Sequence, residues 1–268
     1  MKLEPTTLAI FDYSGTLSLG AVKFGQAGNL ERHLTKSGLA RIGIDTSERY
    51  WDAVVNPTWA RASTSAAGFL SITAERIRGL AIPGTSSMFV EAAVSKFMAA
   101  YMHHSNIDAG WRPLLADIEV RPDTLCLIAT DHYAEATEAI RTHLADLGIP
   151  STPIARRKMT TEKPGFMVAN SADIGYAKAS NRFWQAVRNA CPTGPLKQLL
   201  LVDDFGVNEQ SASDYPATGP GEDRIQATRQ ALDDVFGPDS QIIHFIAGGN
   251  PEAAIAAAGQ AVRKALQI

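Results

Sequence analysis

The chain has 268 residues, of which 45% are apolar and 20% are charged, a balance typical of a globular protein with a sizeable core. Its formal net charge of −3 and its lack of a basic tract argue against nucleic acid or an anionic membrane surface as a partner. No apolar run approaches the roughly 20 residues of a membrane span, and the expected first strand leaves no room for a signal peptide. We therefore expect a soluble, cytoplasmic protein whose two cysteines are reduced and buried.

The first informative stretch is an apolar run from Leu8 to Phe11 that ends in Asp12 and continues into Gly15 and Thr16. The run is short and rich in strand-favouring residues, so it predicts a buried β-strand. Asp12 would follow the carboxyl end of that strand, where open parallel sheets place their ligand sites. Gly15 allows the backbone to bend, so that successive N–H groups can converge on an anion.

The segment from 19 to 117 contains no convincing strand but several helical patterns. Leucines share one face of a helix expected near 27–38, and a stripe of apolar residues at 90–101 has helical spacing. Asp45 and Glu48 have the spacing of a capping box and predict the start of another helix. We interpret this segment as a separate helical domain inserted after the first strand.

From about residue 118, strands and helices alternate. Further buried strands are expected at 125–129, 166–169, 199–202 and 242–246. Helices are expected at 132–147, 179–191, 225–236 and 255–266, and exposed loops at 149–164 and 210–222. The alternation predicts an α/β fold with a doubly wound parallel sheet that is covered by helices on both faces.

Polar residues directly follow or end three of the expected strands, namely Asp12, Thr130 and the pair Asp203-Asp204. Because the carboxyl ends of parallel strands meet at one edge of a sheet, we expect these side chains to lie together. A carboxylate in such a cluster can attack phosphorus and form an aspartyl-phosphate, and Mg²⁺ prefers the oxygen ligands that an acid pair supplies. The pattern predicts Asp12 as the nucleophile, Thr130 as a hydroxyl donor and Asp203-Asp204 as metal carboxylates.

Four stretches resemble the motifs of the haloacid dehalogenase-like (HAD) hydrolase superfamily, in the order that the family shows. Residues 12–17, Asp-Tyr-Ser-Gly-Thr-Leu, resemble motif I, and Thr130 resembles the threonine of motif II. Residues 171–184 resemble motif III, and residues 202–208, Val-Asp-Asp-Phe-Gly-Val-Asn, resemble the acidic motif IV.

The resemblance implies the organisation of the chain. Residues 1–18 and 118–268 would form the family's Rossmann-like α/β core domain, and residues 19–117 would form an all-helical cap domain of the C1 type. In this family the cap sets substrate specificity, so the resemblance implies a reaction class without naming the substrate. We expect a small phosphorylated molecule as the substrate.

The resemblance also implies how a metal and a phosphate are bound. Asp204 would be the main ligand of Mg²⁺, together with Asp12 and the backbone carbonyl of Ser14, with Asp203 at the edge of the metal site. Asn208 would brace the loop. The residues expected to bind the phosphate group are Tyr13, Gly15, Thr130, Asp131 and Lys178.

Two lysines compete for the motif III role. Lys163-Pro164 resembles the "KP" form of the motif, but 40 residues (203 − 163) separate Lys163 from Asp203, too many for one helix and one strand. Lys178 precedes Asp203 by 25 residues (203 − 178), which accommodates a helix, a loop and a strand. We therefore expect Lys178, at the start of a helix, to contact the phosphoryl group.

Ser14 departs from the family pattern, which has an aspartate that protonates the leaving group and activates water. Such general acid–base help is worth about 10²–10⁴-fold in rate, and a serine hydroxyl has too high a pKa to replace it at neutral pH. Asp131, His132 or a residue of the cap could take over the role. The substitution predicts slow or narrowly restricted hydrolysis.

The function expected from these observations is magnesium-dependent hydrolysis or transfer of a phosphoryl group. One alternative is a hydrolytic dehalogenase, which uses the same aspartate on carbon. Those relatives carry tyrosine where Ser14 stands and lack the acid pair, so Asp203-Asp204 argues against it. The other alternative is a catalytically weak member of the family that is retained as a binding or regulatory protein.

Overall fold

The computed structural model describes residues 5–156, 165–191, 195–209, 221–237 and 240–268. They contain a six-stranded parallel sheet in the order β3-β4-β2-β1-β5-β6. The strands are β1 (Thr7–Phe11), β2 (Thr124–Thr130), β3 (Ser151–Pro153), β4 (Phe166–Asn170), β5 (Gln198–Asp203) and β6 (Ser240–His244). The prediction of an α/β fold with a doubly wound parallel sheet is confirmed.

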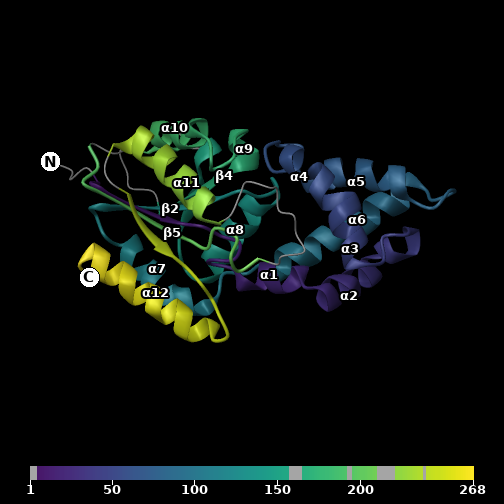
Figure 1. The fold of residues 1–268 in the computed structure, drawn as a ribbon, viewed down its shortest axis with the longest axis horizontal. Coiled ribbons are helices and arrows are strands. Elements are labelled where there is room, and N and C mark those ends of the chain that lie inside the picture. Colours follow the sequence, from purple (N-terminus) through teal and green to yellow (C-terminus); the bar gives the residue numbers. More distant parts are fainter. Residues whose placement is uncertain (1–4, 157–164, 192–194, 210–220, 238–239) are drawn as a thin grey trace.

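The central strands are apolar on both faces because each face is covered by a layer of helices. In β1, Ala9 and Phe11 pack into one layer, whereas Leu8 and Ile10 pack into the other, as the two-residue period of a strand requires. The first layer contains α7 (Arg112–Glu119), α8 (Ala136–Asp146) and α12 (Pro251–Leu266). The second contains α9 (Ser171–Ile174), α10 (Asn181–Ala190) and α11 (Gly221–Phe236), and Figure 1 shows both layers.

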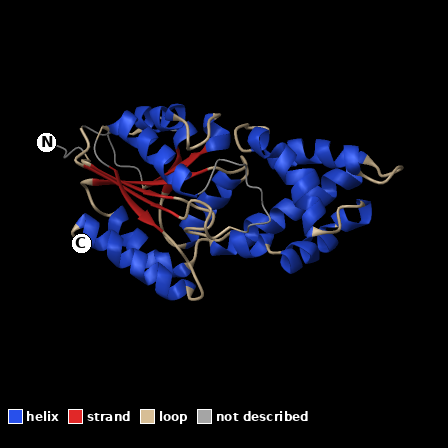
Figure 2. Cartoon of the chain, in the orientation of Figure 1, coloured by secondary structure: helices blue, strands red, loops and turns tan. Residues whose placement is uncertain are grey.

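The second part of the molecule is built from helices alone and lies beyond the carboxyl ends of the strands (Figure 2). Its α-helices are α1 (Leu19–Gly25), α2 (Ala27–Ser37), α3 (Ser47–Tyr50), α4 (Asn56–Ala62), α5 (Gly68–Leu80) and α6 (Ser87–His104). The shorter turns of the chain are η1 (Leu39–Ile42), the π-helical η2 (Trp51–Val55), η3 (Ala109–Trp111) and η4 (Ile154–Arg156). A separate apolar core holds these helices together.

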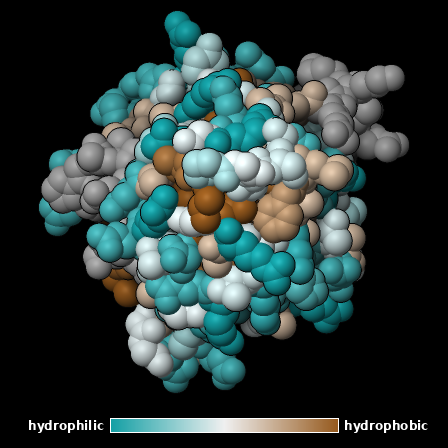
Figure 3. Space-filling view, turned by 90° about the vertical axis from the view of Figure 1, so that its right-hand side faces the viewer, coloured by the Kyte–Doolittle hydropathy of each residue, from teal (hydrophilic) through white to brown (hydrophobic). Residues whose placement is uncertain are grey.

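The far end of this helical part is mostly hydrophilic, with a small apolar patch on the face that Figure 3 shows. Exposed large apolar side chains in this part of the chain include Ile82, Met88 and Phe89, between α5 and the start of α6. Among the described residues, none of the helices combines the length and the apolar character that crossing a membrane requires.

The border between the two packing units falls earlier than expected. Ile107, Trp111 and Leu115 belong to the apolar core of the sheet, together with Leu17 and Leu19. The helix α7 therefore packs on the sheet, and the residues that pack in the helical core extend only from Phe24 to α6, with Tyr133 added from the sheet side. The division at 117/118 stays a prediction about domains, but in packing terms the helical unit ends near α6.

Several local predictions differ from the structure. The edge strand β3 was not expected in its Pro- and Thr-rich segment, although a sheet edge tolerates proline. The strand β6 begins two residues before the expected 242–246, and Ile246 lies outside it with 55% of its surface exposed. The helix α3 is capped by Thr46, whose hydroxyl accepts the N–H of Arg49, and not by Asp45. Of the loops expected at 149–164 and 210–222, residues 157–164 and 210–220 lie outside the described residues.

Candidate active site

Three strand ends meet at one edge of the sheet. Asp12 directly follows β1, Thr130 is the last residue of β2, and Asp203 is the last residue of β5. Since β1 pairs with β2 on one side and with β5 on the other, these residues are neighbours across the sheet. The N–H of Asp12 donates to the carbonyl of Val202 at 2.9 Å, which continues the pairing of β1 and β5 beyond Phe11. Residues far apart in the sequence are thereby brought to one place.

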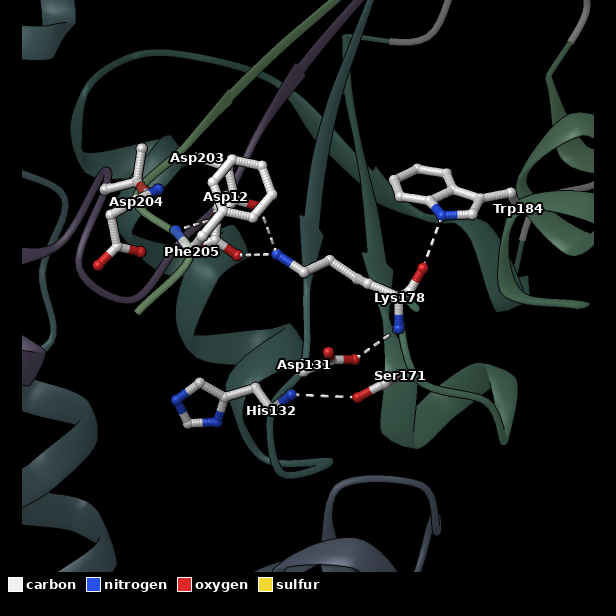
Figure 4. Close-up of polar contacts among 10 residues, drawn as sticks. Asp12, Asp131, His132, Ser171, Lys178, Trp184, Asp203, Asp204 and Phe205 are labelled. Atoms are coloured by element: carbon white, nitrogen blue, oxygen red, sulfur yellow. Dashed lines mark hydrogen bonds and ion pairs between the residues drawn. The ribbon is translucent and has the colours of Figure 1, made fainter. Parts of the chain in front are cut away.

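The carboxylates of Asp12, Asp203 and Asp204 form a compact buried cluster. Their oxygen atoms lie within 4.8 Å of one another, and no residue of the three is more than 6% exposed. The Nζ of Lys178 donates to the Asp12 carboxylate and, at 2.8 Å, to Oδ2 of Asp203, as Figure 4 shows. One ammonium group thus bridges two carboxylates, and the cluster keeps an excess of negative charge.

Burial and the neighbouring charges shift the pKa values of three of these groups. Burial raises the pKa of the Asp12 carboxyl well above its usual range; Lys178 opposes the rise, and Asp203 and Asp204 add to it. Burial also raises the pKa of Asp204 to about 7, with nearby carboxylates adding to the effect. Burial by itself would lower the pKa of Lys178, but attraction to Asp12 and Asp203 outweighs this effect. The pKa of Lys178 is therefore raised, and this lysine stays protonated. A second cation would favour the ionised form of all three acids.

The turn after Asp12 needs glycine and threonine for different reasons. Gly15 has a φ of +78°, and a Cβ at this position would lie 2.4 Å from Oδ2 of Asp204. The Thr16 hydroxyl accepts the N–H of Asp204 at 3.0 Å. The Gly-Thr pair therefore lets the β1 loop pack directly against the loop that carries Asp204.

Asn208 ties three segments together around this contact. Its side-chain amide donates to the carbonyls of Gly15 at 2.8 Å and Phe245 at 3.2 Å, and its side-chain oxygen accepts the N–H of Ala247 at 2.9 Å. Its own N–H donates to Asp204 at 3.0 Å. These contacts suit the bracing role expected for Asn208.

Lys178 reaches the cluster from the loop between α9 and α10. Its N–H donates to Oδ1 of Asp131 at 2.9 Å, and its carbonyl accepts the indole N–H of Trp184 at 2.7 Å (Figure 4). The expectation that Lys178 begins a helix is wrong, because α10 is capped by Ser180 and begins at Asn181. The carboxylate of Asp131, a residue expected to bind phosphate, holds the loop of Lys178. Lys163 lies outside the described residues.

Tyr13 and Gly15, two further residues expected to bind phosphate, each have a partner within the protein. The Tyr13 side chain is fully buried in the core of the sheet, and its hydroxyl donates to the carbonyl of Ser105. The N–H of Gly15 donates to the carbonyl of Ser18 at 3.0 Å. The N–H groups of Tyr13 and Ser14 donate to no acceptor in the described part of the chain, so these two remain for an anion.

Sequence reasoning missed Glu209. Its side chain and that of Ser14 line the same pocket, and the Ser14 hydroxyl lies near enough to Glu209 to favour its ionised form. The Oε2 atom of Glu209 is buried and has no hydrogen-bond partner among the described residues. Burial raises the pKa of Glu209 to about 7, the Asp12 carboxylate adds to the rise, and Arg224 opposes it. A carboxyl group therefore stands beside Ser14.

His132, one of the candidates to replace that aspartate, is fixed in its neutral form. Its Nδ1 accepts the N–H of Tyr133 at 2.8 Å, so the ring proton belongs on Nε2, which lies 3.0 Å from the hydroxyl of Tyr101. The residue is 1% exposed, and burial lowers its pKa to about 4. A ring held in this way does not serve as a base at neutral pH.

The acidity of His132 predicts a pH-dependent stability. The unfolded chain binds a proton at this ring below about pH 6.5, whereas the folded chain does so only below about pH 4. The contribution is fully present above pH 6.5 and is lost as the pH falls toward 4, a difference of about 3 kcal/mol in the free energy of unfolding. Denaturant unfolding at pH 7 and at pH 4 should show that the wild type loses about 3 kcal/mol relative to His132→Gln, because the raised carboxyl pKa values of Asp204 and Glu209, which act in the opposite direction, are common to both proteins. An equal loss in both proteins would contradict the assignment, and the exposed His103→Gln variant is the control.

Comparisons with known proteins identify no family. No protein-family model matches the chain, and no curated protein matches it. Similar solved structures include a 2-haloacid dehalogenase from Pseudomonas syringae pv. Tomato DC3000, with a TM-score of 0.48, 14% identity, and coverage of 79% of this chain and 83% of that one. They also include a HAD family enzyme from Bacteroides thetaiotaomicron (TM-score 0.46, 11% identity, coverage 91% and 96%). L-2-haloacid dehalogenase from Xanthobacter autotrophicus has a TM-score of 0.46, 13% identity, and coverage of 97% and 98%. Similarity at this level leaves the interpretation to the geometry of the site.

Proposed function

We propose that this chain is a hydrolase of the HAD superfamily that releases phosphate from a small phosphorylated molecule in a magnesium-dependent reaction. The observation that carries the proposal is the buried cluster of Asp12, Asp203 and Asp204 with Lys178 across two of its members. The helices between β1 and α7 would then be a C1-type cap over this site.

The donor set fits a hard divalent cation. Three buried carboxylates face one ammonium group, and burial together with the neighbouring carboxylates raises the pKa of Asp12 and of Asp204. Carboxylate oxygens are the ligands that Mg²⁺ takes in proteins. Asp12, Asp204 and the carbonyl of Ser14 would hold the ion, with Asp203 beside them. When bound, Mg²⁺ would offset the repulsion between these carboxylates and a phosphate dianion.

The residues of the chain account for the two chemical steps. An oxygen of Asp12 forms a bond to phosphorus while the bond from phosphorus to the leaving oxygen breaks, which places the phosphoryl group on Asp12. Water then attacks that phosphorus, the bond to Asp12 breaks, and phosphate leaves with the carboxylate restored. The ammonium of Lys178, the Thr130 hydroxyl and the N–H groups of Tyr13 and Ser14 stabilise the charge on the transferring group.

Both steps need a group that can donate and accept a proton, which the Ser14 hydroxyl cannot do at neutral pH. We assign this role to Glu209. In the first step its carboxyl gives a proton to the leaving oxygen, and in the second its carboxylate takes a proton from the attacking water. Its unpartnered buried oxygen and its contact with Ser14 support the assignment. A carboxyl with a pKa near 7 is suited to both transfers at neutral pH.

A screen for turnover tests the proposal. Phosphate esters and haloacids are each incubated with Mg²⁺ and with EDTA, and the release of phosphate and of halide is measured. We expect phosphate release that EDTA abolishes and added Mg²⁺ restores. Halide release without a metal would contradict the proposal in favour of a dehalogenase. Failure to turn over any phosphate ester would contradict it in favour of a binding or regulatory protein.

The assignment of Lys178 has its own test. Lys178→Met should lower kcat for phosphate release by about 10²–10³-fold, because a preorganised donor to the developing charge is lost. Lys163→Met is the matched control and should leave kcat within about twofold of the wild type. Circular dichroism would check that both variants fold. A large loss of kcat in Lys163→Met alone would overturn the assignment.

A further inference from the structure

A mostly apolar pocket opens beside the carboxylate cluster. The open space between its lining residues, counted out into the solvent, is about 680 Å³. It lies between the β1 loop and the helical part of the chain, because its lining comes from Ser14, Tyr133, Glu209 and the helices α1 to α6. Half of its lining residues are aromatic, namely Phe24, Tyr50, Trp51, Trp59, Phe69, Phe97, Tyr101 and Tyr133.

The walls of this pocket are held in place by contacts among the rings themselves. The ring of Tyr133 packs edge-on against Trp59 and Phe69, with distances between ring centroids of 5.0 Å and 4.8 Å. Phe24 likewise packs edge-on against Phe97 and Tyr101, with distances between ring centroids of 5.4 Å and 5.2 Å. Rings that restrain one another in this way form a pocket before any ligand arrives, so little ordering is needed on binding.

The composition of the pocket lining argues against an anionic ligand. None of the described residues that line it is a lysine, arginine or histidine, and Glu209 is its one ionisable carboxyl. Burial raises the pKa of Tyr50 and of Tyr133, so these phenols are neutral. A second phosphate or a carboxylate of a ligand would have no cation to pair with in this space. A ligand with several hydroxyl groups would lose the hydrogen bonds that these groups make to water.

We propose that this pocket binds the leaving group of the substrate, and that this group is an uncharged aryl or bulky alicyclic alcohol. The inference rests on the proposed function for the reacting phosphate, since Ser14 and Glu209 join the pocket to the carboxylate cluster. The preferred substrates would be phosphate monoesters of apolar alcohols. Sugar phosphates, nucleotides and bisphosphates would be poor substrates.

A binding measurement tests the pocket without any turnover. Naphthol, which carries no phosphate, is titrated into the protein in a calorimeter, with glycerol as the polar comparison. We expect naphthol to bind and glycerol not to bind, and Trp51→Ala should weaken naphthol binding about tenfold or more through lost apolar contact. Trp51 is half-buried, so its truncation spares the helical core. Absence of naphthol binding to the wild type would overturn the inference.

Turnover then tests the substrate class. Naphthyl phosphate should exceed glucose phosphate in kcat/KM by about 10²-fold or more. Val22→Arg places a cation on the half-buried pocket face of α1, and it should shift preference from naphthyl phosphate toward a carboxyphenyl phosphate about tenfold or more. Ala27→Arg adds the same charge at an exposed position outside the pocket and should shift nothing.

These outcomes separate the two proposals. Naphthol binding without turnover of any phosphate ester would support the pocket and contradict the proposed function. Turnover of glucose phosphate equal to that of naphthyl phosphate would support the proposed function and overturn the pocket. An unchanged preference in a folded Val22→Arg variant would likewise overturn it.

Discussion

Asp12→Asn should lose phosphate release by about 10⁴-fold or more while the protein stays folded, because the amide cannot attack phosphorus. The fold should tolerate the change, since burial and two neighbouring carboxylates already disfavour the charge on Asp12. Lys178 keeps its contact with Asp203 in the variant. Initial rates and thermal unfolding, measured on the same preparation, separate the chemistry from the stability.

The covalent step has a readout of its own. Mass spectrometry of protein quenched during turnover should find a phosphoryl group on the wild type and none on Asp12→Asn. Asp117→Asn, a substitution on the surface of α7, is the control and should behave as the wild type does. Near wild-type turnover in Asp12→Asn would rule out the covalent mechanism.

Glu209→Gln should lower kcat by about 10²–10⁴-fold for an alkyl phosphate, whose leaving oxygen needs a proton. Nitrophenyl phosphate has a leaving group that departs without one, so formation of the phosphoryl-aspartate from it should be nearly unaffected. Single-turnover kinetics measure that first step alone. A structural role for Glu209 would slow both substrates alike and would contradict the assignment. Glu222→Gln, an exposed position in α11, is the matched control.

Ser14→Asp provides the complementary change. In the wild type it should raise hydrolysis little, because Glu209 already supplies a carboxyl beside Ser14. In Glu209→Gln it should restore hydrolysis of the alkyl phosphate about tenfold or more, since a carboxyl returns to the same place. Glu209 would not be the base if the double variant failed to recover hydrolysis while Ser14→Asp alone strongly raised the hydrolysis rate. That result would show that the serine at position 14 is what limits hydrolysis.

The elements that sequence predicted well are those whose pattern is local. The apolar runs at 8–11, 125–129, 166–169 and 199–202 are strands, because a strand buried on both faces needs an unbroken apolar segment. The position of Asp12 and Asp203 followed from this, since parallel strands that share an edge bring their ends together. The short strand β3 carried no apolar run, and its pairing with β4 comes from the sheet.

The unexpected side-chain contacts at the site have a common physical cause. Whether Tyr13 faced a ligand or the core depended on the carbonyl of Ser105, which is 92 residues away in the chain. Whether Asp131 bound an anion or a loop depended on Lys178, 47 residues away. A partner at such separation leaves no trace in the periodicity of a single segment, so the sequence did not indicate these side-chain contacts.

By itself, the sequence determined the sheet, the order of the strand-end motifs and the acids that would meet, because hydrophobic period and turn chemistry act within a few residues. The tertiary structure alone decided where Glu209 lies and what surrounds Ser14. Glu209 follows the acid pair in a polar stretch with no period, and only the packing of loops sets it beside Ser14, 195 residues earlier (209 − 14). The aromatic pocket was likewise decided by packing, because its rings come from separate helices whose spacing along the chain indicates a core and not a cavity.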